Sequence, residues 1–129
     1  MTVVVDASVV VKWFLPEIDR EAALRLRDSG ERIIAPDHLF AESTNAVRKK
    51  VRRGEVSPEH ARGVIGRIVA AAVGIEVVSC LDLASDAFGI AMTCGCSVYD
   101  AIYVALAVQR EARLITAADR LYKAVSNLP

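Results

Sequence analysis

The sequence contains few aromatic residues, few cysteines and no excess of either charge. Aromatic residues make up 5% of the 129, so a core must consist mainly of valine, alanine, leucine and isoleucine. The cysteines Cys80, Cys94 and Cys96 are odd in number and lack Cys-x-x-Cys spacing, which argues against a disulfide framework and a thioredoxin-type site. Cys94 and Cys96 also lack the further ligands that a zinc site needs, so we interpret all three as free thiols.

Charge and hydropathy exclude further classes of protein. Sixteen basic and sixteen acidic residues cancel, so no overall field attracts nucleic acid, although a local basic patch is compatible with that total. No basic leader precedes the first apolar run, which Asp6 interrupts, so we do not expect a secretory signal. The apolar stretches 68–75 and 101–108 are too short to span a bilayer. We therefore expect a cytoplasmic protein with no membrane partner.

Several common catalytic motifs are missing as well. The sequence has no GxxxxGK[ST] phosphate loop, no GxGxxG turn and no GxSxG elbow. His38 and His60 lie near expected helix starts without metal-ligand spacing, and we interpret both as surface residues. Acidic side chains remain as the candidate functional groups.

What the sequence does contain is an alternation of short strands and longer helices. Residues 2–5 are β-branched throughout, which predicts a strand that is apolar on both faces, in the middle of a parallel sheet. Gly54 separates two helices of an expected αα-hairpin, whose N-caps are predicted at Asp37 and Ser57. The pattern predicts one α/β domain over 1–129 with a sheet of at least four strands. Strands are expected at 2–5, 32–35, 75–79 and 113–116, and helices at 9–15, 17–29, 37–53, 58–72, 81–93 and 97–108, with a short helix after residue 119.

Several acids lie at positions where a parallel sheet gathers side chains. Four of them follow expected strands and two lie early in helices, namely Asp6, Asp37, Asp82 and Asp119, then Glu42 and Asp100. Each has a structural alternative: Asp6 suits a helix cap, Glu42 a solvated helix face, and Asp100 a capping box with Ser97. The pattern alone does not tell which of the six converge.

Convergence of carboxylates has a chemical consequence. Two of them about 4 Å apart repel by roughly 4 kcal/mol at an effective dielectric constant near 20. Three or four together must take up protons or hold a hard cation, and all-oxygen sites favour magnesium or manganese. Such ions activate water and stabilise the entering and leaving oxygens of phosphoryl-transfer reactions.

Four segments of the sequence resemble the motifs of PIN-domain ribonucleases, in particular the VapC-type toxins of toxin–antitoxin pairs. They occur in the expected order and spacing, from the first strand almost to the C-terminus. The fourth has two residues between its threonine and aspartate, where the family usually has one. The segments are Val-Val-Asp6-Ala-Ser8-Val-Val-Val-Lys12-Trp, Ala41-Glu42-Ser-Thr-Asn45-Ala-Val-Arg, Val98-Tyr99-Asp100-Ala-Ile-Tyr-Val-Ala-Leu-Ala and Leu114-Ile115-Thr116-Ala-Ala-Asp119-Arg.

The resemblance implies a fold and a site. The fold is a three-layer α/β/α sandwich, with a parallel sheet of four to five strands and the αα-hairpin as an insertion. Asp6 and Asp100 correspond to the principal Mg²⁺ or Mn²⁺ ligands, and Glu42 completes the site directly or through water. Asp119, with its altered spacing, corresponds to a fourth catalytic acid that is displaced or reaches the metal through water. Supporting residues that orient water or carboxylates are Ser8, Asn45 and Thr116.

The resemblance also implies an activity and partners. The reaction is endonucleolytic hydrolysis of RNA by metal-activated water, without a covalent intermediate. A cognate antitoxin covers the pocket and the helical hairpin, and the protein forms a homodimer. Because an anionic pocket needs basic flanks to hold a polyanion, RNA contacts are expected at Lys12, Arg48, Lys49 and Arg52, for which a solvated helix end is the alternative.

Four other functions are compatible with parts of this pattern. A response-regulator receiver needs two adjacent acids after the first strand, where only Asp6 stands. A haloacid-dehalogenase-type phosphatase needs Asp-x-Asp, and Ser8 occupies the second position. A non-toxin PIN nuclease and a degenerate PIN domain that serves as a binding scaffold remain open, the latter because of the spacing before Asp119.

Overall fold

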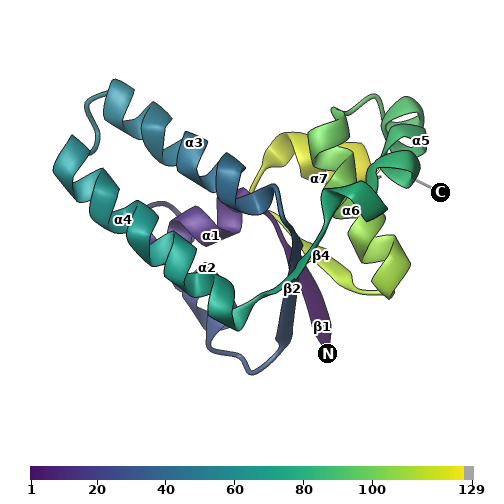
Figure 1. Cartoon of the computed structure of the whole chain (residues 1–129), viewed down its shortest axis with the longest axis horizontal. Coiled ribbons are helices and arrows are strands. Elements are labelled where there is room, and N and C mark those ends of the chain that lie inside the picture. The colour runs from purple at the N-terminus through teal and green to yellow at the C-terminus, as the bar shows by residue number, and fades with distance from the viewer. Residues whose placement is uncertain (127–129) are drawn as a thin grey trace.

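The computed structural model describes residues 1–126, in which four parallel strands form one sheet between helices (Figure 1). The strands lie in the order β3-β2-β1-β4, and Val3 of β1 is in register with Ile33 of β2 and Arg113 of β4. All four predicted strands are confirmed, and the sheet has the minimum predicted number. Their bounds are β1 (Thr2–Val5), β2 (Arg32–Pro36), β3 (Glu76–Val78) and β4 (Arg113–Ile115).

Helices follow and separate the strands as the alternating pattern predicted. The helix expected at 17–29 begins only at Arg20, after Asp19 adopts a left-handed φ of 66°. The helix expected at 81–93 is divided, because its first turn is a 3₁₀ turn. The helices are α1 (Ala7–Phe14), α2 (Arg20–Arg27), α3 (Leu39–Arg52), α4 (Pro58–Ala70), α5 (Ala84–Cys94), α6 (Val98–Arg110) and α7 (Asp119–Ser126), with 3₁₀ turns η1 (Ala71–Gly74) and η2 (Cys80–Asp82).

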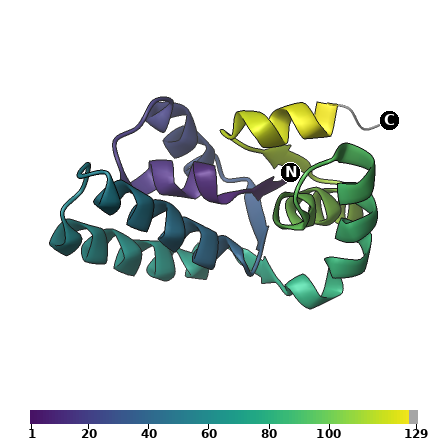
Figure 2. The ribbon, with the colours of Figure 1, turned by 90° about the horizontal axis from the view of Figure 1, so that it is seen from above.

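The helices cover both faces of the sheet, which confirms the three-layer α/β/α fold. Figure 2 shows α1 to α4 on one side of the strands and α5 to α7 on the other. Helix α6 packs on β1, β2 and β4, and residues 100–107 of α6 are all buried, as the apolar sequence of this helix predicted. Strand β1 lies inside the sheet with Val3, Val4 and Val5 fully buried. The residue that follows β1 is therefore held by the centre of the core.

Helices α3 and α4 form the predicted hairpin, which projects away from the sheet (Figure 1). Gly54 adopts φ +75° in the turn, and the Ser57 hydroxyl accepts a 3.1 Å hydrogen bond from the backbone N–H of His60. The prediction that Asp37 caps α3 is wrong. The Asp37 carboxylate instead accepts a 3.1 Å hydrogen bond from the backbone N–H of Cys80, which joins the ends of β2 and β3.

The three cysteines are free and half-buried. Among residues 1–126, no single helix is long and apolar enough to cross a membrane. Helices α5 and α6 reach that length only together, across a bend of 111°.

Candidate active site

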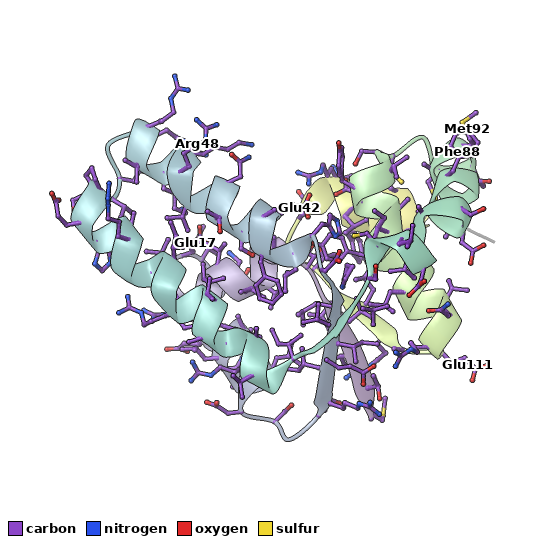
Figure 3. All side chains as sticks on the ribbon, in the orientation of Figure 1. Glu17, Glu42, Arg48, Phe88, Met92 and Glu111 are labelled. Carbon is purple, nitrogen blue, oxygen red and sulfur yellow. The ribbon has the colours of Figure 1, made fainter. Side chains whose placement is uncertain are left out.

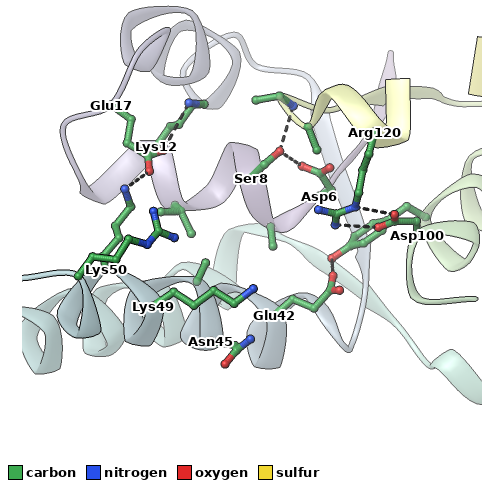
Figure 4. Close-up of a pocket in the computed structure, with 17 residues that line it drawn as sticks. Asp6, Ser8, Lys12, Glu17, Glu42, Asn45, Lys49, Lys50, Asp100 and Arg120 are labelled. Atoms are coloured by element: carbon green, nitrogen blue, oxygen red, sulfur yellow. Dashed lines mark hydrogen bonds and ion pairs between the residues drawn. The ribbon is translucent and has the colours of Figure 1, made fainter. Parts of the chain in front are cut away.

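The carboxyl ends of β1 and β4 open into a pocket of about 350 Å³, shown in Figure 4. One end of this pocket, the acid end, is lined by Asp6, Glu42 and Asp100. The other, the basic end, is lined by cationic side chains from α1 and α3. The pocket residues are Asp6, Ala7, Ser8, Val11, Lys12, Glu17, Glu42, Asn45, Ala46, Lys49, Lys50, Arg53, Asp100, Tyr103, Ala117, Ala118 and Arg120.

Asp6 is buried where β1 ends and α1 begins, with 4% of its surface exposed. It caps α1, because its carboxylate accepts a 3.3 Å hydrogen bond from the N–H of Val9. Two hydroxyls also donate to it: Ser8 Oγ to Oδ1 at 2.5 Å, and Thr116 Oγ1 to Oδ2. Burial raises the pKa of Asp6, and the bonds from Ser8 and Thr116 oppose that rise. Asp6 is thus both the predicted cap and a pocket residue.

Asp100 lies in the first turn of α6, where Ser97 caps the helix by accepting a 3.1 Å hydrogen bond from the Asp100 N–H. A capping box would require the Asp100 carboxylate to accept a hydrogen bond from the backbone N–H of Ser97, and it does not do so. It pairs with the guanidinium of Arg120, whose Nε donates to Oδ2 at 2.8 Å and whose Nη2 donates to Oδ1 at 3.1 Å. This pairing, with weaker contributions from Glu42 and Asp6, raises the pKa of Arg120.

Glu42 reaches the pocket from α3 and is held there by a hydroxyl group of α6. The hydroxyl of Tyr103, a buried residue of α6, donates to Glu42 Oε1 at 2.6 Å. His38, the residue before α3, has its Nε2 at 3.5 Å from the same oxygen, an ion pair only when the imidazole is protonated. Burial and the bond to Glu42 raise the pKa of Tyr103. The alternative of a merely solvated Glu42 does not describe this geometry.

The interpretation of His38 as a surface residue is wrong. Its ring is half-buried against the ring of Tyr103, with centroids 4.6 Å apart, and its Nε2 donates to the carbonyl oxygen of Tyr99 at 2.9 Å. The i, i+4 spacing of His38 and Glu42 is the signal that sequence reasoning missed. His60 is exposed, as predicted.

The structure does not bring Asp119 to the pocket. Asp119 is the exposed first residue of α7, and the next residue, Arg120, lines the pocket instead. Between Thr116 and α7, Ala117 and Ala118 line the pocket, so Asp119 follows the pocket-lining segment as the first residue of the helix. The other two acids that follow strands, Asp37 and Asp82, are also exposed and line no part of the pocket.

The three residues predicted to support the acids differ in what they contact. Ser8 and Thr116 both donate to Asp6, as described above. Asn45 lines the pocket, but its side-chain oxygen accepts a 3.0 Å hydrogen bond from Arg48 Nε. Within residues 1–126 no hydrogen bond joins Asn45 to an acid of the pocket.

The basic end contains two of the four predicted RNA contacts, Lys12 and Lys49; Arg48 and Arg52 do not line the pocket. Lys50 and Arg53 line it in their place. The signal for them is helical periodicity, because 42, 45, 46, 49, 50 and 53 share one face of α3, whereas 48 and 52 do not. Glu17 lies among the lysines, 3.4 Å from Lys12 Nζ and 2.5 Å from Lys50 Nζ.

The acid end has the donor chemistry of a site for a hard divalent cation, since Asp6, Glu42 and Asp100 offer only oxygen. In the present conformation, no three acid, histidine or cysteine side chains among residues 1–126 form a group that could hold a metal ion. Two of these acids are engaged by other side chains. Arg120 occupies both carboxylate oxygens of Asp100, and Tyr103 holds Glu42. The residues therefore fit such an ion in the kind of atom that they offer.

Comparison with known proteins gives a family match over nearly the whole chain. Residues 3–128 match the family model described as PIN domain. The chain is 32% identical over 116 residues to ribonuclease VapC3 of Pyrobaculum aerophilum, which covers 90% of this chain and 88% of that protein.

Two solved structures have a similar fold. The crystal structure of PAE2754 from Pyrobaculum aerophilum superposes with a TM-score of 0.73 at 19% identity, covering 96% of this chain and 79% of that one. Mycobacterium tuberculosis VapC20, described as a sarcin–ricin loop cleaving toxin, superposes with a TM-score of 0.71 at 17% identity, covering 95% and 94%.

Proposed function

Because this chain belongs to the PIN-domain family, we propose that it is a metal-dependent endoribonuclease and the toxin of a toxin–antitoxin pair. The observation that carries the proposal is the convergence of Asp6, Glu42 and Asp100 in one pocket of a chain related to ribonuclease VapC3. The three acids come from three elements that are far apart in the sequence. A helix cap or a solvated face explains each position separately, but neither explains why all three line one pocket.

We propose Mg²⁺ or Mn²⁺ as the cofactor, held by Asp6 and Asp100 and completed by Glu42. The bound ion supplies Lewis acidity, which activates water and offsets charge that develops on the phosphate oxygens. Ser8 and Thr116 orient the Asp6 carboxylate toward the pocket, and Tyr103 orients Glu42. A catalytic or metal-binding role for Asp119 stays a prediction, since its side chain is exposed outside the pocket.

We propose that the basic end holds the RNA backbone while the acid end cuts it. Lys12, Lys49, Lys50 and Arg53 line the pocket beside the acids, and Glu17 offsets part of their charge. A phosphodiester chain that lies along α3 thus meets cations on its way to the acids. This division resolves the conflict between a negative pocket and a negatively charged substrate.

The proposed protein partners are an antitoxin and a second copy of this chain. An antitoxin segment that lies along the α3–α4 hairpin covers the basic end. For the homodimer, the support is a group of exposed apolar side chains around α5: Leu81, Phe88 and Met92 are 85%, 61% and 71% exposed. Figure 3 shows Phe88 and Met92 at the outer edge of the molecule, far from Glu42 and Arg48. We place the protein in the cytoplasm, where its RNA substrate is found.

The experiment that tests this function is cleavage of an RNA pool with Mg²⁺, followed by mapping of the new ends. The wild type and the Asp100→Asn variant are compared, with the exposed Asp86→Asn as the matched control. We expect discrete cuts from the wild type and the control, and none from Asp100→Asn or after chelation. Wild-type protein that binds RNA but never cuts it would favour the scaffold alternative.

A growth assay separates a toxin from another PIN nuclease. Induced expression of the wild type, without a neighbouring antitoxin gene, is expected to stop growth, and Asp100→Asn is expected to permit it. Normal growth with an active wild-type enzyme would indicate a non-toxin nuclease.

A further inference from the structure

Arg120 stands out because its positive charge is inside the acid end of the pocket. It forms two charge-assisted hydrogen bonds with Asp100, whose side chain is 6% exposed. Figure 4 shows the guanidinium between the Asp6 and Asp100 side chains. A buried carboxylate is costly unless a charged or hydrogen-bonding partner compensates it. For Asp100 that partner is Arg120.

The segment 116–118, which hydrogen bonds hold in position, places Arg120 in the pocket. Thr116 Oγ1 donates to Asp6 and also accepts a 3.0 Å hydrogen bond from the N–H of Ala118. The N–H of Ala117 donates to Ser8 Oγ at 2.9 Å. These bonds hold the segment before α7 against the start of α1, so that the second residue of α7 enters the pocket and its first residue, Asp119, stays outside.

From this geometry we infer that Arg120 is the counter-ion of the metal-free site, and that a divalent cation must displace it from Asp100. The inference rests on the proposed metal-dependent function. A guanidinium has five donors and no acceptor, so Arg120 cannot join the ion as a ligand. It donates to both oxygens of Asp100, so it competes with the cation for the same carboxylate. The Arg120 side chain is 73% exposed, so little of its own surface is buried in its present position.

Two opposite effects follow from this role. Arg120 stabilises the metal-free protein, because it compensates a buried carboxylate and attenuates repulsion from Glu42 and Asp6. At the same time it weakens the binding of a divalent cation, because the cation competes with it. A residue with a merely structural role produces the first effect without the second.

The experiment is a calorimetric titration of Mn²⁺ into metal-free protein, with thermal unfolding in chelator measured in parallel. The variants are Arg120→Ala and Arg120→Gln, which both remove the charge while the second keeps most of the side-chain length. Arg113→Ala is the matched control, because Arg113 pairs with Glu31 at 3.0 Å and does not line this pocket. Neither readout requires RNA cleavage.

We expect both Arg120 variants to bind Mn²⁺ about tenfold more tightly than the wild type, the change that 1.4 kcal/mol of lost competition produces. Their metal-free forms are expected to unfold at lower temperature, and Arg113→Ala to bind Mn²⁺ like the wild type. Unchanged or weaker binding by both Arg120 variants, with normal binding by the wild type, would overturn the inference and leave the proposed function standing. No binding by any of the proteins would overturn both. Binding by the Arg120 variants alone would support the inference in its strongest form.

Discussion

The two ends of the pocket are built in different ways, although one helix, α3, contributes to both. At the acid end, each carboxylate comes from a different element and is held by a specific donor: Asp6 by Ser8 and Thr116, Glu42 by Tyr103. At the basic end, the cations lie on α3 and α1 and are offset by a single acid, Glu17.

The acid end depends on side chains in fixed positions, whereas the basic end depends on charges whose positions can vary. The acid end is buried and depends on long-range contacts, so a change there is expected to affect stability and chemistry together. At the basic end Lys49 and Arg53 are exposed, and their charges act mainly through a field that water and salt screen, whereas Lys12 and Lys50 are paired with Glu17. We therefore expect substitutions at the basic end to change RNA affinity and little else.

The largest effect is expected from Asp6→Asn, in opposite directions for activity and stability. Loss of several kcal/mol of charge stabilisation lowers the cleavage rate roughly a thousandfold. Because burial raises the pKa of Asp6 above its ordinary 3.8, stability falls as pH rises from that value through the raised pKa. The neutral variant avoids this loss and is expected to melt higher at pH 7 without metal. A lower melting temperature would mean that the cap, rather than the burial of charge, dominates at this position.

The next effect in size is expected from Thr116→Val, which keeps the shape of the side chain but removes its hydroxyl. This hydroxyl donates to buried Asp6 and accepts from Ala118, so its loss should lower the free energy of unfolding by about 1–3 kcal/mol. Denaturant titration in chelator measures the change. Thr116→Ser, which keeps the hydroxyl, is the control, and an equal loss in both variants would assign the effect to packing of the methyl group.

A smaller effect is expected from Lys49→Ala, compared with Arg52→Ala on the same helix. Lys49 lines the pocket and Arg52 does not. Lys49→Ala should weaken RNA binding several-fold. It should also reduce the slope of the logarithm of the binding constant against the logarithm of salt concentration by about 0.7, the contribution of one phosphate contact to a single strand. Equal losses in the two variants, measured by fluorescence anisotropy, would contradict the placement of RNA along the pocket face of α3.

The smallest effect is expected from Glu17→Gln. This change removes the acid that pairs with Lys12 and Lys50 and leaves a more positive basic end. RNA affinity should rise about twofold at low salt, a change of the size that partly exposed ion pairs produce. A fall in affinity would show that Glu17 positions the two lysines rather than neutralising them.

The sequence was sufficient for features that depend on local pattern. The β-branched residues after Met1 predicted the central strand, and the apolar sequence of 97–108 predicted a buried helix, because periodicity and burial are linked along a continuous segment. The position of Asp6 at the end of the buried strand followed from the same reasoning. Helical spacing along α3 also indicates Lys50 and Arg53, which lie on the same face as Glu42 and Lys49.

Features that depend on contacts between distant segments were not predictable. Asp37 has the local signature of a cap, but the N–H of Cys80 competes for it across the sheet. The bond between Tyr103 and Glu42 joins residues 61 positions apart. Repulsion among the acids was expected to require protons or a metal ion, and the structure supplies Arg120, which pairs with Asp100 in the pocket.

The most direct test of the division between the two ends is single-turnover cleavage of one RNA substrate over a range of enzyme concentrations. Asp100→Asn and Lys49→Ala are compared with the wild type. We expect Lys49→Ala to reach the wild-type rate at saturation but to need more enzyme, whereas Asp100→Asn is expected to bind the RNA without cutting it. Cleavage by Asp100→Asn within tenfold of the wild-type rate, or an equal loss of the saturated rate in Lys49→Ala, would contradict this division.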